Sequence, residues 1–182
     1  MVATFCLVAL IGQQRAGEFS GAVVVKGSQA TYSDKAKQFS ITLPKTWWLE
    51  DDLEARRQFE TTGSLFPNHI GMLSAGAGKK TWDPIIRITK ILPEKSDKPK
   101  RIEDHLKWWK DQPAQQLYFQ GLGVVKGIRY AVWHELGWTY VNGYVQDKDS
   151  VWSIAVLIPK ASWKKKLPFV REVISSFKLL TQ

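Results

Sequence analysis

The chain has 182 residues, of which 44% are hydrophobic and 24% charged, which is the composition of a folded globular protein rather than of a disordered or collagen-like one. Its length predicts one domain with a core large enough to need neither disulfides nor a structural metal. The single cysteine, Cys6, excludes a disulfide framework and a Cys-based zinc site. No apolar run reaches the roughly 20 residues of a membrane-spanning helix.

The formal net charge of +9 comes from 26 Lys and Arg against 17 Asp and Glu. Such a surplus favours anionic partners such as nucleic acid, anionic phospholipid or acidic protein surfaces. The charges are mixed along most of the chain, and only Lys164 to Lys166 form a run of three, so solubility also accounts for the surplus. We expect no nucleic-acid partner, because the predicted strands show no alternation of aromatic and basic residues.

The N-terminal segment resembles a secretory leader. Val2 to Ile11 form an uncharged apolar run of the length of a signal-peptide core, and small residues follow it, among them the triplet Ser20-Gly21-Ala22. We therefore expect residues 1–22 to be a signal peptide, 23–28 a linker and 29–182 one domain. The alternative for the apolar run is a buried first strand. Removal of the leader would also remove Cys6, in keeping with an oxidising compartment.

In the first half of the chain, Gln29 to Tyr32 and Phe39 to Leu43 read as short strands, the second of which ends at a proline. Asp51 followed by Glu54 has the spacing of a capping box and predicts a helix over 52–59. Ile85 to Ile91 is rich in β-branched residues and predicts a strand.

The clearest helix is predicted over Arg101 to Gln112, with Pro113 ending it. Its apolar residues lie on one face, so we expect Trp109 in the core and Trp108 nearer to solvent; the stripe is formed by Ile102, His105, Leu106 and Trp109.

Three successive strands follow: Gly127 to Glu135, Trp138 to Gln146 and Val151 to Ile158. We expect the last two to form a hairpin with a loop of about four residues. Both faces of Val151 to Ile158 are apolar, which predicts a central strand covered on both sides. Pro168 is expected in the first turn of a final helix. Because helices stand apart from runs of hairpin-linked strands, the predicted fold class is α+β with an antiparallel sheet.

No catalytic constellation is evident, so we expect no enzyme activity, no cofactor and no metal. Gly76 to Thr81 lacks the glycine and hydroxyl positions of a phosphate-binding loop. The acidic residues Glu50, Asp51, Asp52 and Glu54 have helix-start rather than ligand spacing. The alternative of a hydrolase or ligand-binding protein, with a pocket between sheet and helices, would rest on Asp104, His105 and His134.

A partner-binding surface is a further hypothesis. The chain contains nine tryptophans, two pairs of which are adjacent. Aromatic and arginine side chains dominate the energy of protein interfaces. The helix over 101–112 combines both kinds of residue, and the candidate partner-binding residues are Arg101, Lys107, Trp108 and Lys110.

Several short motifs resemble the PsbP-like domain family across roughly 29–180. Tyr32-Ser33-Asp34 is followed by a strand ending in Pro44-Lys45-Thr46-Trp47, and the chain closes with an aromatic hairpin and a helix ending Ile174-Ser175-Ser176-Phe177. The strand from Ile85 and the helix from Arg101 stand where those domains place a strand and a helix.

The resemblance implies a central antiparallel sheet flanked by helices, which is an α-β-α sandwich, and a mostly non-enzymatic role. Members from plants and cyanobacteria attach to the lumenal side of photosystem II, many bacterial members are exported, and a eukaryotic relative of the fold binds a small GTPase. No photosystem-binding N-terminal segment is identified here, so a photosynthetic role is not carried over. We expect an exported, periplasmic or extracellular accessory domain that binds a protein or an envelope component. The alternatives are the pocket-bearing protein above and a basic binder of anionic lipid or nucleic acid.

Overall fold

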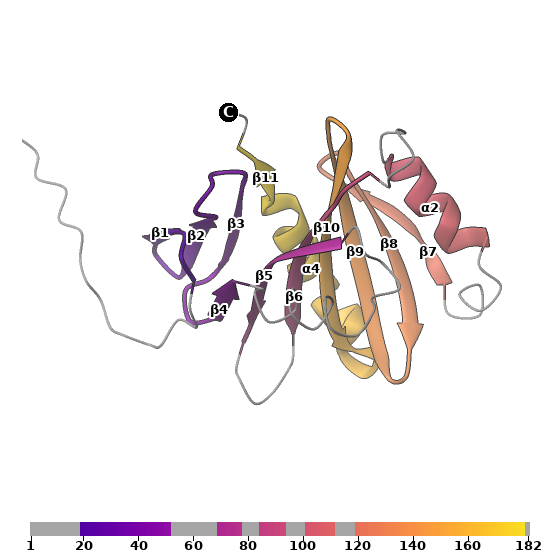
Figure 1. The fold of residues 1–182 in the computed structure, drawn as a ribbon. Helices are drawn as coiled ribbons and strands as arrows, with labels where there is room; N and C mark the ends of the chain where they lie inside the picture. The colour runs from indigo at the N-terminus through magenta and orange to yellow at the C-terminus, as the bar shows by residue number, and fades with distance from the viewer. Residues whose placement is uncertain (1–18, 52–68, 78–83, 94–100, 112–118, 181–182) are drawn as a thin grey trace, which may run out of the picture.

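The structure is a computed structural model that describes residues 19–51, 69–77, 84–93, 101–111 and 119–180 (Figure 1). Within these residues two antiparallel sheets form most of the molecule. The smaller sheet has the strand order β1-β2-β3-β11, with β1 at Ala22–Lys26, β2 at Gln29–Ser33, β3 at Phe39–Pro44 and β11 at Lys178–Leu179.

The larger sheet has seven strands in the order β4-β5-β6-β10-β9-β8-β7. Their bounds are Trp48–Asp51 for β4, His69–Gly76 for β5, Ile85–Ile91 for β6, Ser150–Pro159 for β10, Trp138–Asp147 for β9, Ile128–Glu135 for β8 and Phe119–Val125 for β7. In the described part of the chain, two helices accompany the sheets, α2 at Ile102–Asp111 and α4 at Trp163–Ser176, and the short 3-10 turn η1 at Lys160–Ser162 precedes α4.

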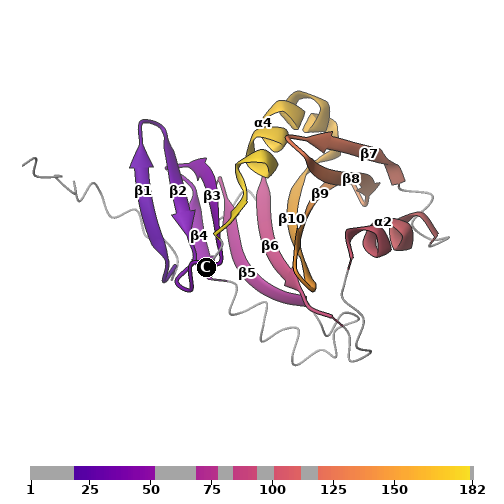
Figure 2. The same cartoon turned by 90° about the horizontal axis from the view of Figure 1, so that it is seen from above.

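The main core lies between one face of the larger sheet, the smaller sheet and α4 (Figure 2). Trp152, Ile154, Val156 and Ile158 alternate along β10 and point into this core, where all four are fully buried. Opposite them, Phe39, Ile41 and Leu43 of β3 alternate in the same way. A Cβ at Gly143 would stand 2.7 Å from Ile174 Cγ2, so glycine at this position lets α4 lie directly on β9.

A second, smaller core lies on the other face of the larger sheet. Ile102 and Leu106 of α2 pack there, four residues apart on one helix face, as predicted. They contact a group of sheet residues formed by Ile91, Ala131, Trp133, Tyr144 and Val151. The prediction of two apolar faces on β10 is therefore confirmed, because Trp152 serves the main core and Val151 the smaller one.

The fold class is confirmed in its coarser part, a mostly antiparallel sheet structure of the α+β type. The finer expectation, one central sheet flanked by helices, needs correction. Among the described residues, one face carries a second sheet as well as α4, and the other face carries α2. The helix expected over 52–59 lies outside the described residues.

Three local expectations also need correction. Residues 23–28, expected as a linker, hold most of β1 and its turn into β2. The last helix begins at Trp163, so Pro168 lies inside it rather than in its first turn. The hairpin between β9 and β10 turns over two residues, Lys148 and Asp149, because the strands pair out to Asp147 and Ser150.

Candidate functional site

The register of the larger sheet aligns one row of residues across its seven strands, and every strand except β5, which contributes Gly76, places a large apolar side chain in it. Successive pairings join Trp48 to Gly76, Gly76 to Ile85, Ile85 to Leu157, Leu157 to Tyr140, Tyr140 to Trp133 and Trp133 to Phe119. Paired residues point to the same face of a sheet. Four aromatic side chains from different strands thus lie in one line, on the face that also carries α2.

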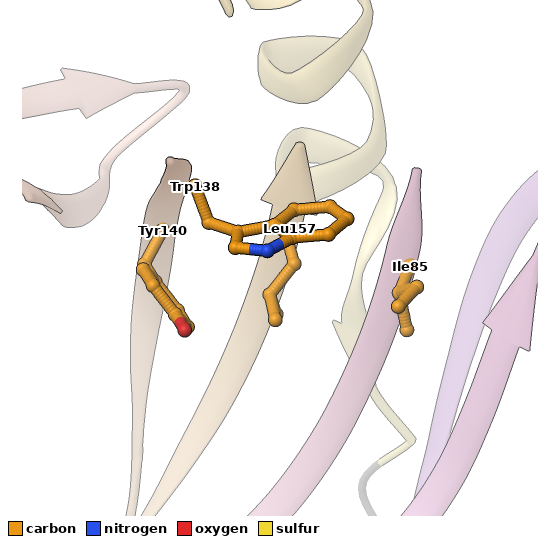
Figure 3. A pocket seen from close by; sticks show the side chains of 4 residues that line it. All are labelled: Ile85, Trp138, Tyr140 and Leu157. Atoms are coloured by element: carbon orange, nitrogen blue, oxygen red, sulfur yellow. The ribbon is translucent and has the colours of Figure 1, made fainter. Parts of the chain in front are cut away.

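Part of this row forms a shallow depression of about 210 Å³, called here the Trp138 depression and lined by Ile85, Trp138, Tyr140 and Leu157. Figure 3 shows the indole of Trp138 above Leu157 and directed toward Ile85, with Tyr140 beside them. The ring of Tyr140 stacks on Trp133, with ring centroids 5.3 Å apart and planes 1° from parallel. This stack connects the depression with the small core under α2.

The same face contains two buried polar atoms that have no partner among the described residues, Trp48 Nε1 and Asn142 Oδ1. Asn142 follows Tyr140 on the same face of β9, and its Nδ2 donates to Tyr144 Oη at 3.4 Å. Trp48 lies across Gly76, where a Cβ would stand 2.9 Å from Trp48 Nε1, so only glycine leaves room for the indole. Arg87 of β6 is exposed on this face, in register with Ala155 and, beyond it, Asn142.

Helix α2 is held to this face by polar contacts at its first turn. The backbone N–H of Ile102 donates to Gln146 Oε1 at 3.3 Å, and Arg129 of β8 forms an ion pair with Glu103. The Arg129 hydrogen bond is the main reason that the pKa of Glu103 is lowered below its ordinary value of 4.5. The helix therefore has a defined position on this face of the sheet.

The predicted partner-binding residues are placed only in part. Arg101 directly precedes α2 and Lys107 lies on it, and both are exposed. Trp108 and Lys110 are residues of α2, but their side chains, like that of Trp109, lie outside the described part of the structure.

The hydrolase alternative required Asp104, His105 and His134 to meet, and the fold separates them. His134 lies on the face of β8 opposite Trp133, where its ring meets the edge of Trp163 of α4 at a centroid distance of 5.4 Å. Asp104 and His105 belong to α2, which packs on the other face of the sheet. The three residues therefore form no common site.

The described contacts of His134 are structural. Its Nδ1 lies 2.9 Å from the hydroxyl of Thr139, which is completely buried. Burial, and the nearby charge of Lys160, lower the pKa of His134 below its ordinary value of 6.5. The ring thus joins β8 and β9 to the start of α4.

This lowered pKa makes stability pH-dependent. As the pH falls through about 6.5, His134 binds a proton in the unfolded chain but stays neutral in the folded chain, because its folded-state pKa is lower. The free energy of unfolding therefore decreases until the pH is below the folded-state pKa. We expect His134→Gln to flatten the fall in stability between about pH 8 and pH 5. Denaturant melts of both proteins across this range provide the measurement, and identical pH profiles would contradict the role given to His134.

No group of three or more metal-ligating side chains is found among the described residues. Of the acidic residues considered above, Asp51 accepts hydrogen bonds from the backbone N–H and the hydroxyl of Ser20, and Asp52 and Glu54 lie outside the described part. The segment from Gly76 is a strand end, described only as far as Ala77. No helix in the described part is long and apolar enough to cross a membrane.

The sequence analysis did not predict the row of side chains across the larger sheet, because three of the strands that form it, β4, β5 and β7, were not predicted. A partial signal was present: Trp138 and Tyr140 share a face of one predicted strand, and Leu157 lies on one face of another. Only the pairing register shows that these faces coincide.

No protein-family model and no curated protein matches this sequence. Solved structures do match. The solution structure of cyanobacterial PsbP (CyanoP) from Synechocystis sp. PCC 6803 aligns with 86% of this chain and 95% of its own, with 15% sequence identity and a TM-score of 0.53.

A protein of Bacteroides thetaiotaomicron aligns with 87% of this chain at 13% identity and a TM-score of 0.50, and this chain spans half the length of that one. At such identities the likeness concerns the fold. The order of strands and helices and the alignment over nearly the whole of CyanoP agree with the resemblance carried by Tyr32 to Trp47 and by the C-terminal helix. The chain therefore has a distant PsbP-like fold.

Proposed function

We propose that this chain is an exported, non-enzymatic accessory domain that binds a protein or another component of the cell envelope. The observation that carries the proposal is the Trp138 depression, an apolar and aromatic surface built from three adjacent strands and only partly buried. Aromatic side chains that are only partly buried at a surface are enriched at protein-binding sites. The residues considered for catalysis, Asp104, His105 and His134, in contrast lie on opposite faces of the larger sheet.

The shape of the depression favours a macromolecular partner over a small molecule. Its volume of about 210 Å³ is below the ~300–1,000 Å³ of typical ligand pockets, and it is wide open. The exposed Arg101 and Lys107 lie at or on α2, which packs on the same face of the sheet. In this proposal α2, including Trp108 and Lys110, forms the rim of the binding surface, and the depression forms its centre.

The binding proposal is tested with a matched pair of variants in the host. Trp138→Ala removes the largest side chain of the depression, and Val24→Ala removes an apolar side chain that is 67% exposed on the smaller sheet. Crosslinked complexes are isolated from envelope fractions and quantified for each protein, after thermal melts have shown that both variants fold. We expect the principal complex to disappear for Trp138→Ala alone. Equal complex formation by both variants would disprove the proposed surface.

Export is tested separately. N-terminal sequencing of the protein isolated from its own cells should place the mature start between about residues 17 and 30. Cleavage at Ala22 would remove the contact of Phe19 with Tyr32 and the hydrogen bonds of Ser20 with Asp51, and the mature chain would begin with β1. A mature protein that keeps Met1 or Val2 in the cytosol would contradict this prediction.

A further inference from the structure

The turn between β8 and β9 contains a residue that the fold does not favour. Leu136 and Gly137 connect the two strands, with φ angles of 49° and 82°. Two positive φ values define a hairpin turn for which Asn-Gly is the preferred sequence, because a leucine side chain is strained there. Leu136 is also 89% exposed, the largest value among the exposed large hydrophobic residues. The Leu136 side chain therefore makes no packing contacts among the described residues that would offset the strain of its backbone.

The segment that is hydrogen-bonded to this turn is rich in lysine. The backbone N–H of Lys160 in η1 donates to the carbonyl of Gly137 at 2.8 Å, which holds the start of α4 against the turn. Lys164 and Lys165 follow in the first turn of α4. All three lysines are exposed, and none forms an ion pair with another residue in the described part of the chain.

The position of these lysines is also unfavourable for the helix. The first turn of α4 contains no acidic residue, and its N-cap, Ser162, makes no side-chain capping bond. Positive charges at a helix N-terminus oppose the helix dipole. Leu136 and the lysines at the start of α4 thus each reduce stability, and the hydrogen bond from Lys160 to Gly137 holds their two elements together at one end of the sheet. The surface formed by Leu136, Lys160, Lys164 and Lys165 is called here the Leu136 surface.

We infer that the Leu136 surface docks the protein peripherally on an anionic phospholipid membrane. Leu136 enters the headgroup region, while Lys160, Lys164 and Lys165 bind lipid phosphates around it. Stable attachment without a spanning helix needs two signals, an apolar anchor and a basic patch, and this surface contains both. Trp163, which directly precedes Lys164 in α4, is half-buried, and tryptophan favours the membrane interface.

A lipid surface fits better than a protein or nucleic acid, because a single apolar tip with exposed lysines on the neighbouring segment offers neither a flat complementary area nor a base-stacking platform. This inference goes beyond the proposed function and does not rest on it, since the Leu136 surface shares no residue with the Trp138 depression.

The test is vesicle co-sedimentation of the full chain and its variants, so that the N-terminal apolar segment is the same in every sample. Vesicles of phosphatidylcholine alone are compared with vesicles containing one third phosphatidylglycerol. We expect binding to the anionic vesicles, weakened by salt. Lys164→Gln combined with Lys165→Gln should weaken it about 25-fold, roughly fivefold for each lysine. Leu136→Asn should weaken it about tenfold.

Matched controls separate docking from general effects. Lys35→Gln combined with Lys37→Gln removes two exposed charges from the turn between β2 and β3. Val124→Thr replaces an apolar side chain on β7 that is 62% exposed. Both should bind vesicles like the unchanged chain. Leu136→Asn should melt at the same or a higher temperature than the unchanged chain, because asparagine tolerates a positive φ. With that melting temperature, a loss of vesicle binding by Leu136→Asn is not caused by unfolding.

Equal binding by all variants, or equal binding to neutral and anionic vesicles, would overturn the inference. So would variants that lose attachment to host membranes but keep full binding to vesicles, because that result identifies a protein receptor at this surface.

Discussion

Replacing Trp152 with alanine is expected to lower the free energy of unfolding by about 3–5 kcal/mol, the range for truncating a large buried aromatic side chain. Trp152 is fully buried on β10, and its ring lies 5.3 Å from that of Phe39 on the smaller sheet and 5.9 Å from that of Phe177 after α4. One side chain thus joins the larger sheet, the smaller sheet and the end of the last helix. The change also removes the hydrogen bond from Trp152 Nε1 to Asp147 at 3.2 Å.

Denaturant melts of Trp152→Ala and Trp138→Ala provide the comparison. Trp138 is only half-buried in the depression, so its truncation should cost much less. If the free energy of unfolding decreases equally in both variants, the packing of the smaller sheet and α4 on Trp152 described here is contradicted.

Asp34→Ala should have the second-largest effect on stability, a loss of about 2–3 kcal/mol. The Asp34 side chain is almost completely buried in the turn between β2 and β3, where one carboxylate oxygen accepts the backbone N–H groups of Gln38 at 2.5 Å and Phe39 at 2.9 Å. Alanine would leave the Gln38 and Phe39 donors without this acceptor. The two bonds fix the start of β3 and therefore the position of Phe39 against Trp152.

Asp34→Asn tests this mechanism because its amide oxygen still accepts, without the charge. We expect about half of the loss seen with alanine. Asp149→Ala, in an exposed turn, should change stability little. The free energies come from chemical denaturation of all three variants, and an Asp34→Ala protein as stable as Asp149→Ala would refute the proposed turn.

These two sites explain why short motifs identified the fold. Tyr32, Asp34 and Trp47 all have structural roles: Tyr32 is buried, Asp34 closes the turn, and Trp47 packs on Phe169 of α4 at a centroid distance of 5.5 Å. Ser176 of the C-terminal motif accepts from the backbone N–H of Thr42 at 3.1 Å, which ties α4 to β3. Motifs of this kind specify how a chain packs, and they contain no information about a partner.

The sequence by itself determined the elements whose pattern is local. The strand Ile85–Ile91 was predicted to the residue, and Trp138–Asp147, Ser150–Pro159 and α2 to within one residue at each end. The apolar residues on both faces of β10 also indicated its central place in the sheet, since a residue pattern records burial on each side. The strands β1, β4, β5 and β7 were missed, because Gly71, Gly121 and Gly123 interrupt two of them and the other two are short.

Tertiary structure alone decided which surfaces exist. Ile85, Leu157, Tyr140 and Trp133 are distant in sequence, and only the pairing register of four strands places them in one row. Likewise, Gly137 and Lys160 are 23 residues apart and meet only because β10 returns the chain to the turn after β8. Local patterns encode which side of each element is buried, but the alignment of neighbouring strands depends on long-range pairing, which sets the register of the sheet.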